Sequence, residues 1–421
     1  MYCSALQRLA YVTQVTAPES GYTFHNRLSH SLKVAQVGRR NCERLRTLAK
    51  NKEITGAAAT LIAALDPDSV EAVCLAHDLG HPPFGHIAED VLNKIAGSSV
   101  PDGFEGNAQS FRILTRLGVR DDRPGLDLTR RTLDGVLKYP WRKRNADRPG
   151  KGKRTRKWGY YVEDAAAYEF ARKGLEPDTA SAVPVRSLAA EIMDWADDLT
   201  YAVHDMDDFF RAGLIPLDRL QMKSSSEYKR FVGLLRDAAD AAPEAFPNCQ
   251  VEELAETARE LLSNHGPGDA YLHTHSARAT MRELGSKLIT RYLEAFVVES
   301  IPGNKVQLRI DDELRREVDA LKMLVTVFVV RHPGLAVVQH GQERVVADLF
   351  GWYFAASKDD RRLFPPGAKE RLDYHEDDPA LRARIVIDLI AGLTETSAIQ
   401  LHRRLSGGWT APTLDAMATM A

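Results

Sequence analysis

The chain has 421 residues, enough for one large domain or two smaller ones, and its 44% hydrophobic and 27% charged residues are typical of a globular protein. Its formal net charge is −2, so no overall field attracts it to nucleic acid or to a membrane surface. No apolar run reaches the roughly 18 residues of a membrane span, and four scattered cysteines form no CxxC pair. We therefore expect a cytoplasmic protein with no membrane partner and no disulfide framework.

The first predicted long helix begins near residue 25, after a loop at 16–24 that contains Gly and Pro. Apolar residues recur along one side of this helix, which indicates one buried face. Arg27 and His30 are three residues apart and share a face. A lone RxxH pair is usually a surface feature, but this one precedes a second histidine-rich motif, which favours a functional role.

The most informative stretch is residues 77–89, which read HDLGHPPFGHIAE. An apolar helical pattern at 70–76 runs into it, and the glycine and paired prolines then end that helix. His77 and Asp78 are thereby predicted at a helix C-terminus, where both can turn toward one ion. Imidazole with carboxylate suits a divalent metal such as Mg, Mn, Fe or Zn. The alternative is a capped helix end with solvated histidines, which this density of histidines disfavours.

Two helix caps are predicted around this motif. The Asp68–Ser69 step could be the N-cap of the helix that carries His77. Further along the chain, Asn107 could either cap the helix that follows it or donate a hydrogen bond in the site. The sequence does not decide between these two roles of Asn107.

A basic loop is predicted at residues 142–157, where Arg and Lys alternate with Gly and Pro and aromatic residues flank the segment. Basic residues with neighbouring aromatics suit phosphate or single-stranded nucleic acid. The alternative is a solvated insertion, which we favour for the centre of the loop.

A strongly periodic helix is predicted over residues 189–208. Asp197, Tyr201 and Asp205 follow one another at intervals of four and therefore stack on one face. An acidic helix face is usually solvated. Asp198 competes with Asp197 as a metal ligand, but only Asp197 has the regular spacing to Tyr201 and Asp205.

The remaining sequence, 209–421, is predicted to be mostly helical, with a possible short strand at 307–310 and a packing helix at 384–395. Arg278 lies on a predicted helix in this part. We find no internal repeat and no clear linker.

These motifs resemble one known family. The string at 77–89 is similar to that of the HD-domain deoxynucleoside triphosphate triphosphohydrolases, or dGTPase-like proteins, which are related to the mammalian SAM-and-HD-domain dNTP hydrolase. The segments at 7–15, 104–109, 157–160, 196–208 and 384–395 resemble further motifs of that family. Gly106 stands where many members have His, and Glu395 stands where they have Asp.

The resemblance implies a role for each motif residue. It implies a single divalent metal held by His30, His77, Asp78 and Asp197, with His86 as general acid or proton shuttle and Glu89 orienting it. It further implies that substrate is bound by the following residues: Arg27, Gln14, Val15, His81, Tyr201, Asp205 and Arg278. The implied reaction converts a dNTP and water to deoxynucleoside and inorganic triphosphate.

The implied fold is all-α, an HD-domain helical fold with one large domain over 1–421 and at most a short β hairpin. Its metal-site core would cover about 1–235 and its C-terminal helical part about 236–421. Relatives are homo-oligomers, and a nucleotide or single-stranded DNA could act as effector. The first motif begins almost at Met1, so the chain is either a shorter member or lacks an arm that contributes to an oligomer interface.

Two alternative functions remain open at this point. Another HD phosphohydrolase would act on other nucleotides, although the spacing of Tyr201 and Asp205 disfavours it. A nucleotide-sensing or nucleic-acid-binding regulator with weak turnover would explain the basic loop, but the presence of His86 and Glu89 argues against it.

Overall fold

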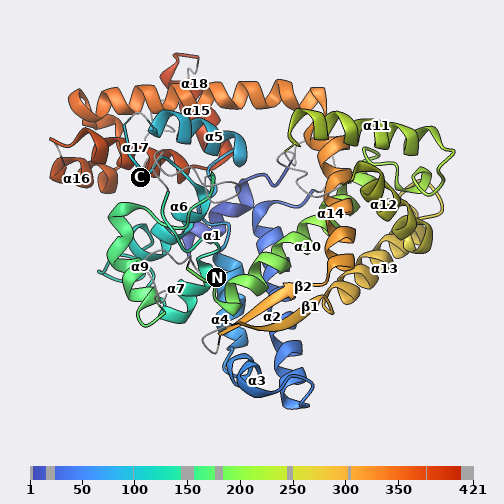
Figure 1. Ribbon diagram of the computed structural model, residues 1–421. Helices are drawn as coiled ribbons and strands as arrows, with labels where there is room; N and C mark the ends of the chain where they lie inside the picture. Colours follow the sequence, from blue (N-terminus) through green and yellow to red (C-terminus); the bar gives the residue numbers. More distant parts are fainter. Residues whose placement is uncertain are drawn as a thin grey trace.

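The computed structural model describes residues 3–15, 24–97, 99–143, 156–175, 184–243, 250–301, 305–375 and 377–408. Its regular structure is almost entirely helical, and within the described residues the only sheet is a two-stranded hairpin (Figure 1). The prediction of an all-α fold with at most a short hairpin is confirmed. The centre of the predicted basic loop and most of the loop at 16–24 lie outside the described residues.

Three helices from separate parts of the sequence form the centre of the molecule: α2 (Arg27–Lys50), α4 (Pro67–Ala76) and α10 (Leu188–Arg211). They pack on one another through apolar side chains that are fully buried, including Val34, Val73 and Leu199. Burial of each such side chain stabilises the fold by about 1.5–3 kcal/mol. This packing brings the start of α2, the end of α4 and the middle of α10 to one place.

Shorter elements of the N-terminal half surround these three helices. In chain order they are α1 (Ser4–Arg8), η1 (Leu9–Tyr11), α3 (Gly56–Ala63), α5 (His86–Ala96), α6 (Gly106–Arg112), η3 (Ile113–Leu117), α7 (Arg130–Val136), η4 (Val162–Asp164) and α9 (Ala165–Arg172). All three ribbon views show α3 as a projection at one extremity, beyond the end of α2.

The hairpin consists of β1 (Phe296–Ile301) and β2 (Lys305–Ile310), which pair antiparallel with Phe296 opposite Ile310. The strand predicted at 307–310 is therefore confirmed. Leu308 of β2 is buried in the central core, and its backbone N–H donates to the Glu191 carboxylate of α10 at 2.8 Å. The hairpin is thus fixed to the same helix that carries Asp197.

The C-terminal half contributes to two cores. Its elements are η5 (Leu217–Arg219), α11 (Ser226–Ala241), α12 (Val251–His265), α13 (His275–Tyr292), α14 (Asp312–Val325), η7 (Thr326–Val330), α15 (Pro333–Asp359), η8 (Arg361–Leu363), α16 (Pro366–Tyr374), α17 (Pro379–Ala391) and α18 (Glu395–Leu405). Helices α11–α14 extend the central core, whereas α15–α18 form a second core with α5. The domain division expected near residue 235 stays a prediction.

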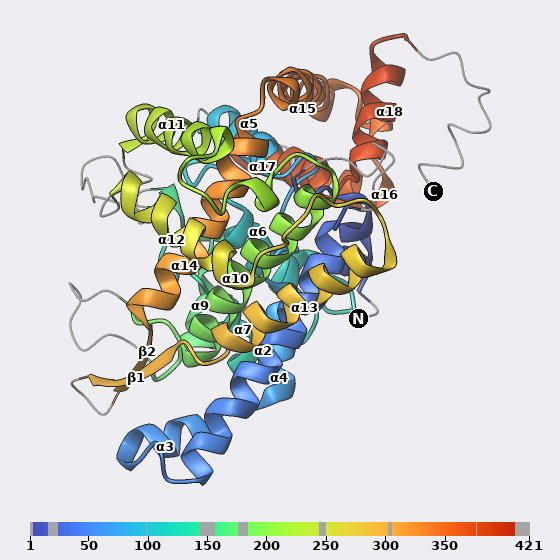
Figure 2. The ribbon, with the colours of Figure 1, turned by 90° about the vertical axis from the view of Figure 1, so that its right-hand side faces the viewer.

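The helix α15 runs along one edge of the molecule, and Figure 2 shows it nearly end-on. Its fully buried side chains begin at Val346, so its first third is largely solvent-exposed. No single helix in the described part of the chain is long and apolar enough to span a membrane. By length and composition alone, only the pair formed by 312–330 and α15 would qualify, and that pair is bent by 74°.

The helix α4 begins differently from the prediction. Its N-cap is Asp66, whose carboxylate accepts the backbone N–H groups of Asp68 and Ser69. The Asp68–Ser69 cap was wrong because Pro67 takes the first helical position, where its fixed φ and missing N–H suit a helix start. The predicted C-terminal end is confirmed, since α4 ends at Ala76 and His77 is its C-cap.

Candidate metal and phosphate site

The central helices bring together the four residues predicted as metal ligands. The ligand atoms of His30, His77 and Asp78 lie within 4.8 Å of one another. Asp197 Oδ1 lies 3.1 Å from His30 Nε2 and 3.6 Å from His77 Nε2. Three elements far apart in the sequence thus supply a compact group of two imidazoles and two carboxylates.

The imidazole of His77 is prepared to bind a cation. Its Nδ1 donates to the carbonyl oxygen of Cys74 at 2.6 Å, one turn earlier on α4, which fixes the tautomer that leaves Nε2 as acceptor. Nε2 is buried and has no hydrogen-bond partner among the described residues. A buried acceptor without a hydrogen-bond partner, beside two carboxylates, suits a divalent cation, so these residues fit such an ion.

The electrostatics of the group also favour a cation. Burial alone would lower the pKa of His77, but the neighbouring carboxylates outweigh it and raise the pKa to about 9. For Asp78 and Asp197, burial acts to raise the pKa and nearby cationic groups keep it well below the usual range. The carboxylates thus remain ionised, and the site attracts a positive charge at His77 Nε2, as a proton or as a metal.

The structure distinguishes Asp197 from Asp198, the other candidate for the fourth metal ligand. Asp198 faces away from the histidines and binds Arg315 at 2.5 Å and Lys322 at 2.7 Å. Asp197 faces the histidines, and its second oxygen accepts from Lys138 at 3.1 Å. The sequence gives no indication of this pairing, because Lys138 and Asp197 are 59 residues apart.

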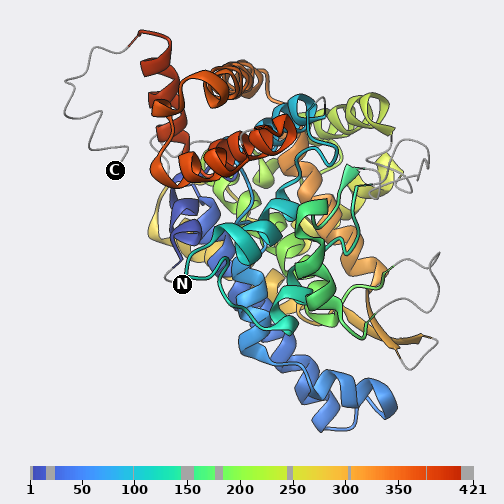
Figure 3. The ribbon, with the colours of Figure 1, turned by 90° about the vertical axis from the view of Figure 1, so that its left-hand side faces the viewer.

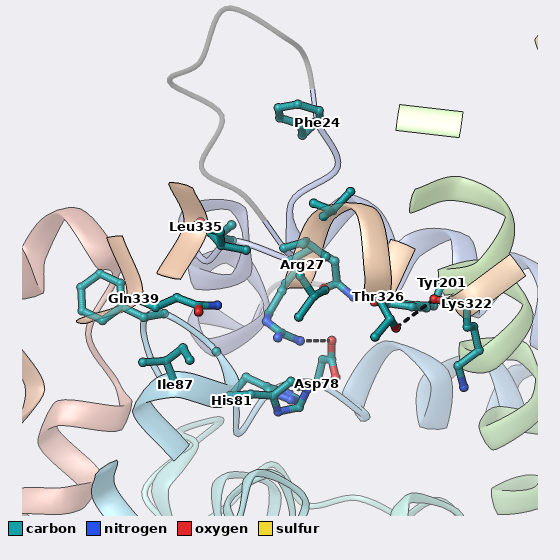
Figure 4. Close-up of a pocket in the computed structure, with 18 of the residues that line it drawn as sticks. Phe24, Arg27, Asp78, His81, Ile87, Tyr201, Lys322, Thr326, Leu335 and Gln339 are labelled. Atoms are coloured by element: carbon teal, nitrogen blue, oxygen red, sulfur yellow. Dashed lines mark hydrogen bonds and ion pairs between the residues drawn. The ribbon is translucent and has the colours of Figure 1, made fainter. Parts of the chain in front are cut away.

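Arg27 and His81 flank Asp78, as Figure 4 shows. Arg27 Nη1 donates to Asp78 Oδ2 at 2.8 Å, while His81 Nδ1 lies 3.1 Å from Asp78 Oδ1. Burial and the nearby Arg27 lower the pKa of His81, which favours the neutral imidazole. Arg27 is 3% exposed and lines the cavity, where its guanidinium suits an oxyanion such as phosphate.

His86 and Glu89 form a second pair beside the first group. His86 Nδ1 lies 2.6 Å from Glu89 Oε2, and the His86 side chain is 70% exposed toward the cavity whereas Glu89 is buried. Burial would raise the pKa of Glu89, but the hydrogen bond to His86 dominates and keeps it far below the usual range. An ionised Glu89 holds Nδ1 protonated, which leaves Nε2 of His86 as the atom able to exchange a proton with a ligand.

Gly106 stands where many family members have His, and its contacts account for this difference. Its N–H donates to Glu89 Oε1 at 2.8 Å, and a Cβ at this position would lie 2.2 Å from the same oxygen. A histidine here would therefore displace Glu89. The place beside Glu89 is taken instead by Lys157, whose Nζ lies 3.5 Å from Glu89 Oε2 and 3.0 Å from Glu105 Oε1.

Asn107 does not cap the helix α6. The cap is Glu105, whose carboxylate accepts the N–H groups of Asn107 and Ala108 and also the side-chain amide of Asn107. The capping role predicted for Asn107 is wrong because a longer acidic side chain two residues earlier reaches both donors. Asn107 instead lines the cavity.

A cavity of about 950 Å³ opens above the four convergent residues. Gln14, Val15 and Tyr201 line it together with Arg27 and His81. In Figure 4, Tyr201 and Lys322 lie on one side of Arg27, while Ile87 and Gln339 lie on the other. A volume of this size holds a ligand as large as a nucleoside triphosphate.

Two predicted substrate residues do not line this cavity. Asp205 lies one turn beyond Tyr201 on α10, is 3% exposed, and has an Oδ2 atom without a hydrogen-bond partner in the described residues. Its burial, reinforced by Asp208, raises its pKa. Arg278 lies on the exposed side of α13 and is not brought to the other site residues.

Among the wall residues that the sequence does not predict, Glu395 makes the most long-range contacts. Glu395 of α18 accepts the backbone N–H groups of Thr13 at 2.8 Å and Phe84 at 3.2 Å, as well as the Thr13 hydroxyl. It thereby joins the N-terminal segment, the loop before His86 and the C-terminal helices. Its replacement of the family's Asp was visible in the sequence, but not these partners, which lie more than 300 residues away.

Comparison with known proteins agrees with this geometry. Residues 27–134 match the HD domain, and residues 308–404 match the phosphohydrolase-associated domain. The chain is 35% identical over 435 residues to a deoxyguanosinetriphosphate triphosphohydrolase-like protein of Corynebacterium efficiens, covering 97% of this chain and 89% of the relative. This chain belongs to the dGTPase-like HD family.

Other relatives carry the same name. The protein of Streptomyces coelicolor is 35% identical over 97% of this chain and 91% of its own length. The protein of Shewanella loihica is 29% identical over 96% and 90%. As a member of the dGTPase-like HD family, this protein is a hydrolase of the phosphohydrolase class, and its His and Asp group could hold a divalent metal.

Proposed function

We propose that this protein is a metal-dependent dNTP triphosphohydrolase, which converts a dNTP and water to deoxynucleoside and inorganic triphosphate. The observation that carries the proposal is the orphaned Nε2 of His77, grouped with His30, Asp78 and Asp197 below a cavity of nucleotide size. The names of the relatives support a deoxynucleotide as substrate.

The side chains around this group have distinct tasks in that reaction. A divalent ion held by His30, His77, Asp78 and Asp197 would supply a Lewis acid that activates water and offsets charge on phosphorus. Arg27 donates to an oxygen of the triphosphate while Asp78 fixes its guanidinium. His86 donates a proton from Nε2 to the leaving 5′-oxygen of the deoxynucleoside, and Glu89 stabilises its protonated form.

Selection of the deoxy sugar is assigned to Tyr201 and Asp205. They lie about 6 Å and 12 Å along α10 from Asp197, at a rise of 1.5 Å per residue, which matches a ribose next to an α-phosphate at the ligand group. The ring of Tyr201 lines the cavity and would exclude a 2′-hydroxyl from a sugar bound beside it. Asp205 is buried one turn beyond Tyr201 and outside the cavity wall, so its unpartnered Oδ2 would accept a hydrogen bond from a 3′-hydroxyl only after a shift of Tyr201.

One assay tests the reaction itself. Purified protein is incubated with Mg or Mn and with each dNTP in turn, and the phosphate products are separated. Inorganic triphosphate with free deoxynucleoside is the expected result, and chelation of the metal should abolish it. Release of pyrophosphate or phosphate instead would assign the protein to another class of HD phosphohydrolase, and nucleotide binding without turnover would favour a sensor.

A second assay tests sugar selection. The wild type should prefer dGTP over GTP by about ten- to a hundredfold, because an added hydroxyl left unpaired costs about 1–3 kcal/mol. Tyr201→Ala should reduce this preference, Asp205→Asn should reduce dGTP turnover, and the control Tyr201→Phe should keep the preference. An unchanged dGTP-to-GTP ratio in Tyr201→Ala, together with unchanged dGTP turnover in Asp205→Asn, would remove the sugar assignment. Homo-oligomerisation and activation by a nucleotide or single-stranded DNA stay predictions.

A further inference from the structure

A second, smaller cavity lies apart from the first, where α6, η3 and η4 meet α16 and α17, on the side of the molecule that Figure 3 turns toward the viewer. Its volume is about 120 Å³, and it shares no wall residue with the first cavity. Arginines dominate its wall, which consists of Arg112, Arg116, Glu163, Arg371, His375, Leu381, Arg384 and Ile385.

The unusual member of this wall is Arg384 of α17. Its side chain is 1% exposed, yet Nε, Nη1 and Nη2 all lack a hydrogen-bond partner among the described residues. One face of the guanidinium lies 3.8 Å above the ring of Tyr161, and Glu163 Oε1 is 3.6 Å from Nε, beyond hydrogen-bond distance. A buried guanidinium with five unused donors is costly, and an absent ligand is one of the few explanations.

The nearby carboxylates are already occupied. Asp388 accepts from Nε and Nη2 of Arg112 at 3.0–3.2 Å and from Arg371 at 3.2 Å. Asp164 accepts from Arg112 at 3.3 Å and from Arg116 at 2.9 Å. The described wall and its partners therefore hold four guanidinium groups against three carboxylates, counting Glu163, which leaves one positive charge in excess. Arg384 has only the long ion pair to Glu163 at 3.6 Å and no hydrogen bond to the described residues.

The geometry points to a binding site for a phosphate group in this cavity, held by Arg384 with Arg116 and Arg371. A volume of about 120 Å³ accommodates one tetrahedral oxyanion but not a nucleoside. Planar guanidinium groups bind phosphate oxygens by paired, charge-assisted hydrogen bonds, so the anion would satisfy the donors of Arg384 and neutralise its charge.

The phosphate group has two possible sources, which are free phosphate and a phosphorylated molecule. Arg116 and Arg371 have 48% and 38% exposed side chains, so the cavity is open at that rim. A terminal phosphate can therefore enter while the rest of its molecule stays outside. Helix α6 begins at Gly106, whose N–H donates to Glu89, and ends at Arg112 in the wall of this cavity.

Binding is tested by calorimetric titration of the full-length protein with inorganic phosphate and, in a second arm, with deoxyguanosine monophosphate. The main variant is Arg116→Ala with Arg371→Ala, which removes the two rim donors without touching the buried arginines. The matched control is Arg236→Ala, an arginine of α11 that is 59% exposed and pairs with Glu252. Arg384→Met is a further variant that replaces the buried guanidinium by an apolar chain.

Phosphate should bind the wild type and the control equally and the double variant at least about tenfold more weakly, as expected when charge-assisted hydrogen bonds are lost. A similar loss with the monophosphate would identify a phosphorylated molecule as ligand, and a loss with inorganic phosphate alone would identify the free anion. If the double variant keeps wild-type affinity, the cavity holds only water and the proposal is overturned. Binding of phosphate in the first cavity would instead be weakened by His77→Ala or Arg27→Ala. Because the double variant leaves the first cavity unchanged, its phosphate affinity is independent of the proposed dNTP hydrolysis.

Discussion

Two buried clusters of charge in this molecule each contain polar atoms without a hydrogen-bond partner among the described residues, and carboxylates surround one of them whereas arginines surround the other. At the end of α4, an imidazole acceptor on His77 faces two carboxylates below a cavity of about 950 Å³. On α17, the guanidinium donors of Arg384 face further arginines around a cavity of about 120 Å³. The orphaned atom is an acceptor in the first cluster and a donor in the second, and the two openings differ in size.

In each cluster, the chemistry of the atom without a hydrogen-bond partner indicates the charge of the ligand that would satisfy it. An acceptor surrounded by negative charge calls for a cation, and a donor surrounded by positive charge calls for an anion. The larger cavity would leave room for a substrate next to a cation, whereas the smaller one has room for a single phosphate group. We therefore expect substitutions in the first cluster to change turnover and substitutions in the second to change stability.

The largest effect is expected for His77→Ala. Removing the imidazole takes away the orphaned Nε2, so metal content and turnover should be lost together. Metal content is measured by elemental analysis of the purified protein, with His86→Ala as a control that keeps the four ligand residues. Full metal occupancy in His77→Ala would show that the metal lies elsewhere.

A smaller loss of turnover is expected for His86→Ala, about 10²–10⁴-fold, which is the usual contribution of general acid–base catalysis. Metal content and substrate affinity should stay near those of the wild type, because the His86 side chain is 70% exposed and is not one of the four ligand residues. The measurement is kcat and KM for a dNTP. A kcat close to that of the wild type would mean that His81 or water transfers the proton instead of His86.

In the second cluster, Asp388→Asn should lower the free energy of unfolding by about 3–5 kcal/mol, the usual effect of breaking a buried ion pair. Asp388 is 5% exposed and compensates Arg112 and Arg371. Denaturant unfolding measures the change. The control is Glu299→Gln on β1, which breaks the exposed pair with Arg309 and should cost about 1 kcal/mol or less. Equal effects of the two substitutions would contradict the distinction between buried and exposed pairs.

Glu191 of α10 adds a partly buried acid to this comparison. Burial is the main cause that raises its pKa to about 7 from an ordinary value of 4.5. Between these two values the folded state holds the proton more tightly than the unfolded state, so stability decreases as pH rises through this window.

Between pH 5 and pH 8, the free energy of unfolding should therefore fall less for Glu191→Gln than for the wild type. The difference between the two decreases should be about 2 kcal/mol or less. Unfolding in denaturant at both pH values gives the difference. Glu299→Gln serves again as the control and should keep the slope of the wild type. A parallel pH dependence of wild type and Glu191→Gln would exclude Glu191 as its source.

The sequence predicted those features that depend on local pattern. Helix periodicity gave the all-α class, and the spacing of Asp197 and Tyr201 placed both on the cavity side of α10. His30 and His77 were singled out by a family motif, and the fold brings their ligand atoms together. Their catalytic and metal-binding roles stay predictions.

The sequence did not predict features that depend on distant pairing. Arg112 and Asp388 are 276 residues apart, so nothing in either segment indicates that they meet. The sequence predicts Arg384 on a packing helix, because an arginine at the start of an apolar run does not reveal whether its charge is compensated. The burial of Arg384 and the occupation of its neighbours become visible only when α6, η4 and α17 are assembled.

The long helix α15 has a mechanical consequence for the first cavity. Leu335 and Gln339 line the cavity near the start of the helix, whereas the anchoring side chains, such as Phe350, lie in the second core. From Leu335 to Phe350 the helix rises about 22 Å over 15 residues. A tilt of about 5° around the anchored end would move Leu335 by about 2 Å at that rise. A small rearrangement of the second core that tilted this helix would therefore change the width of the cavity.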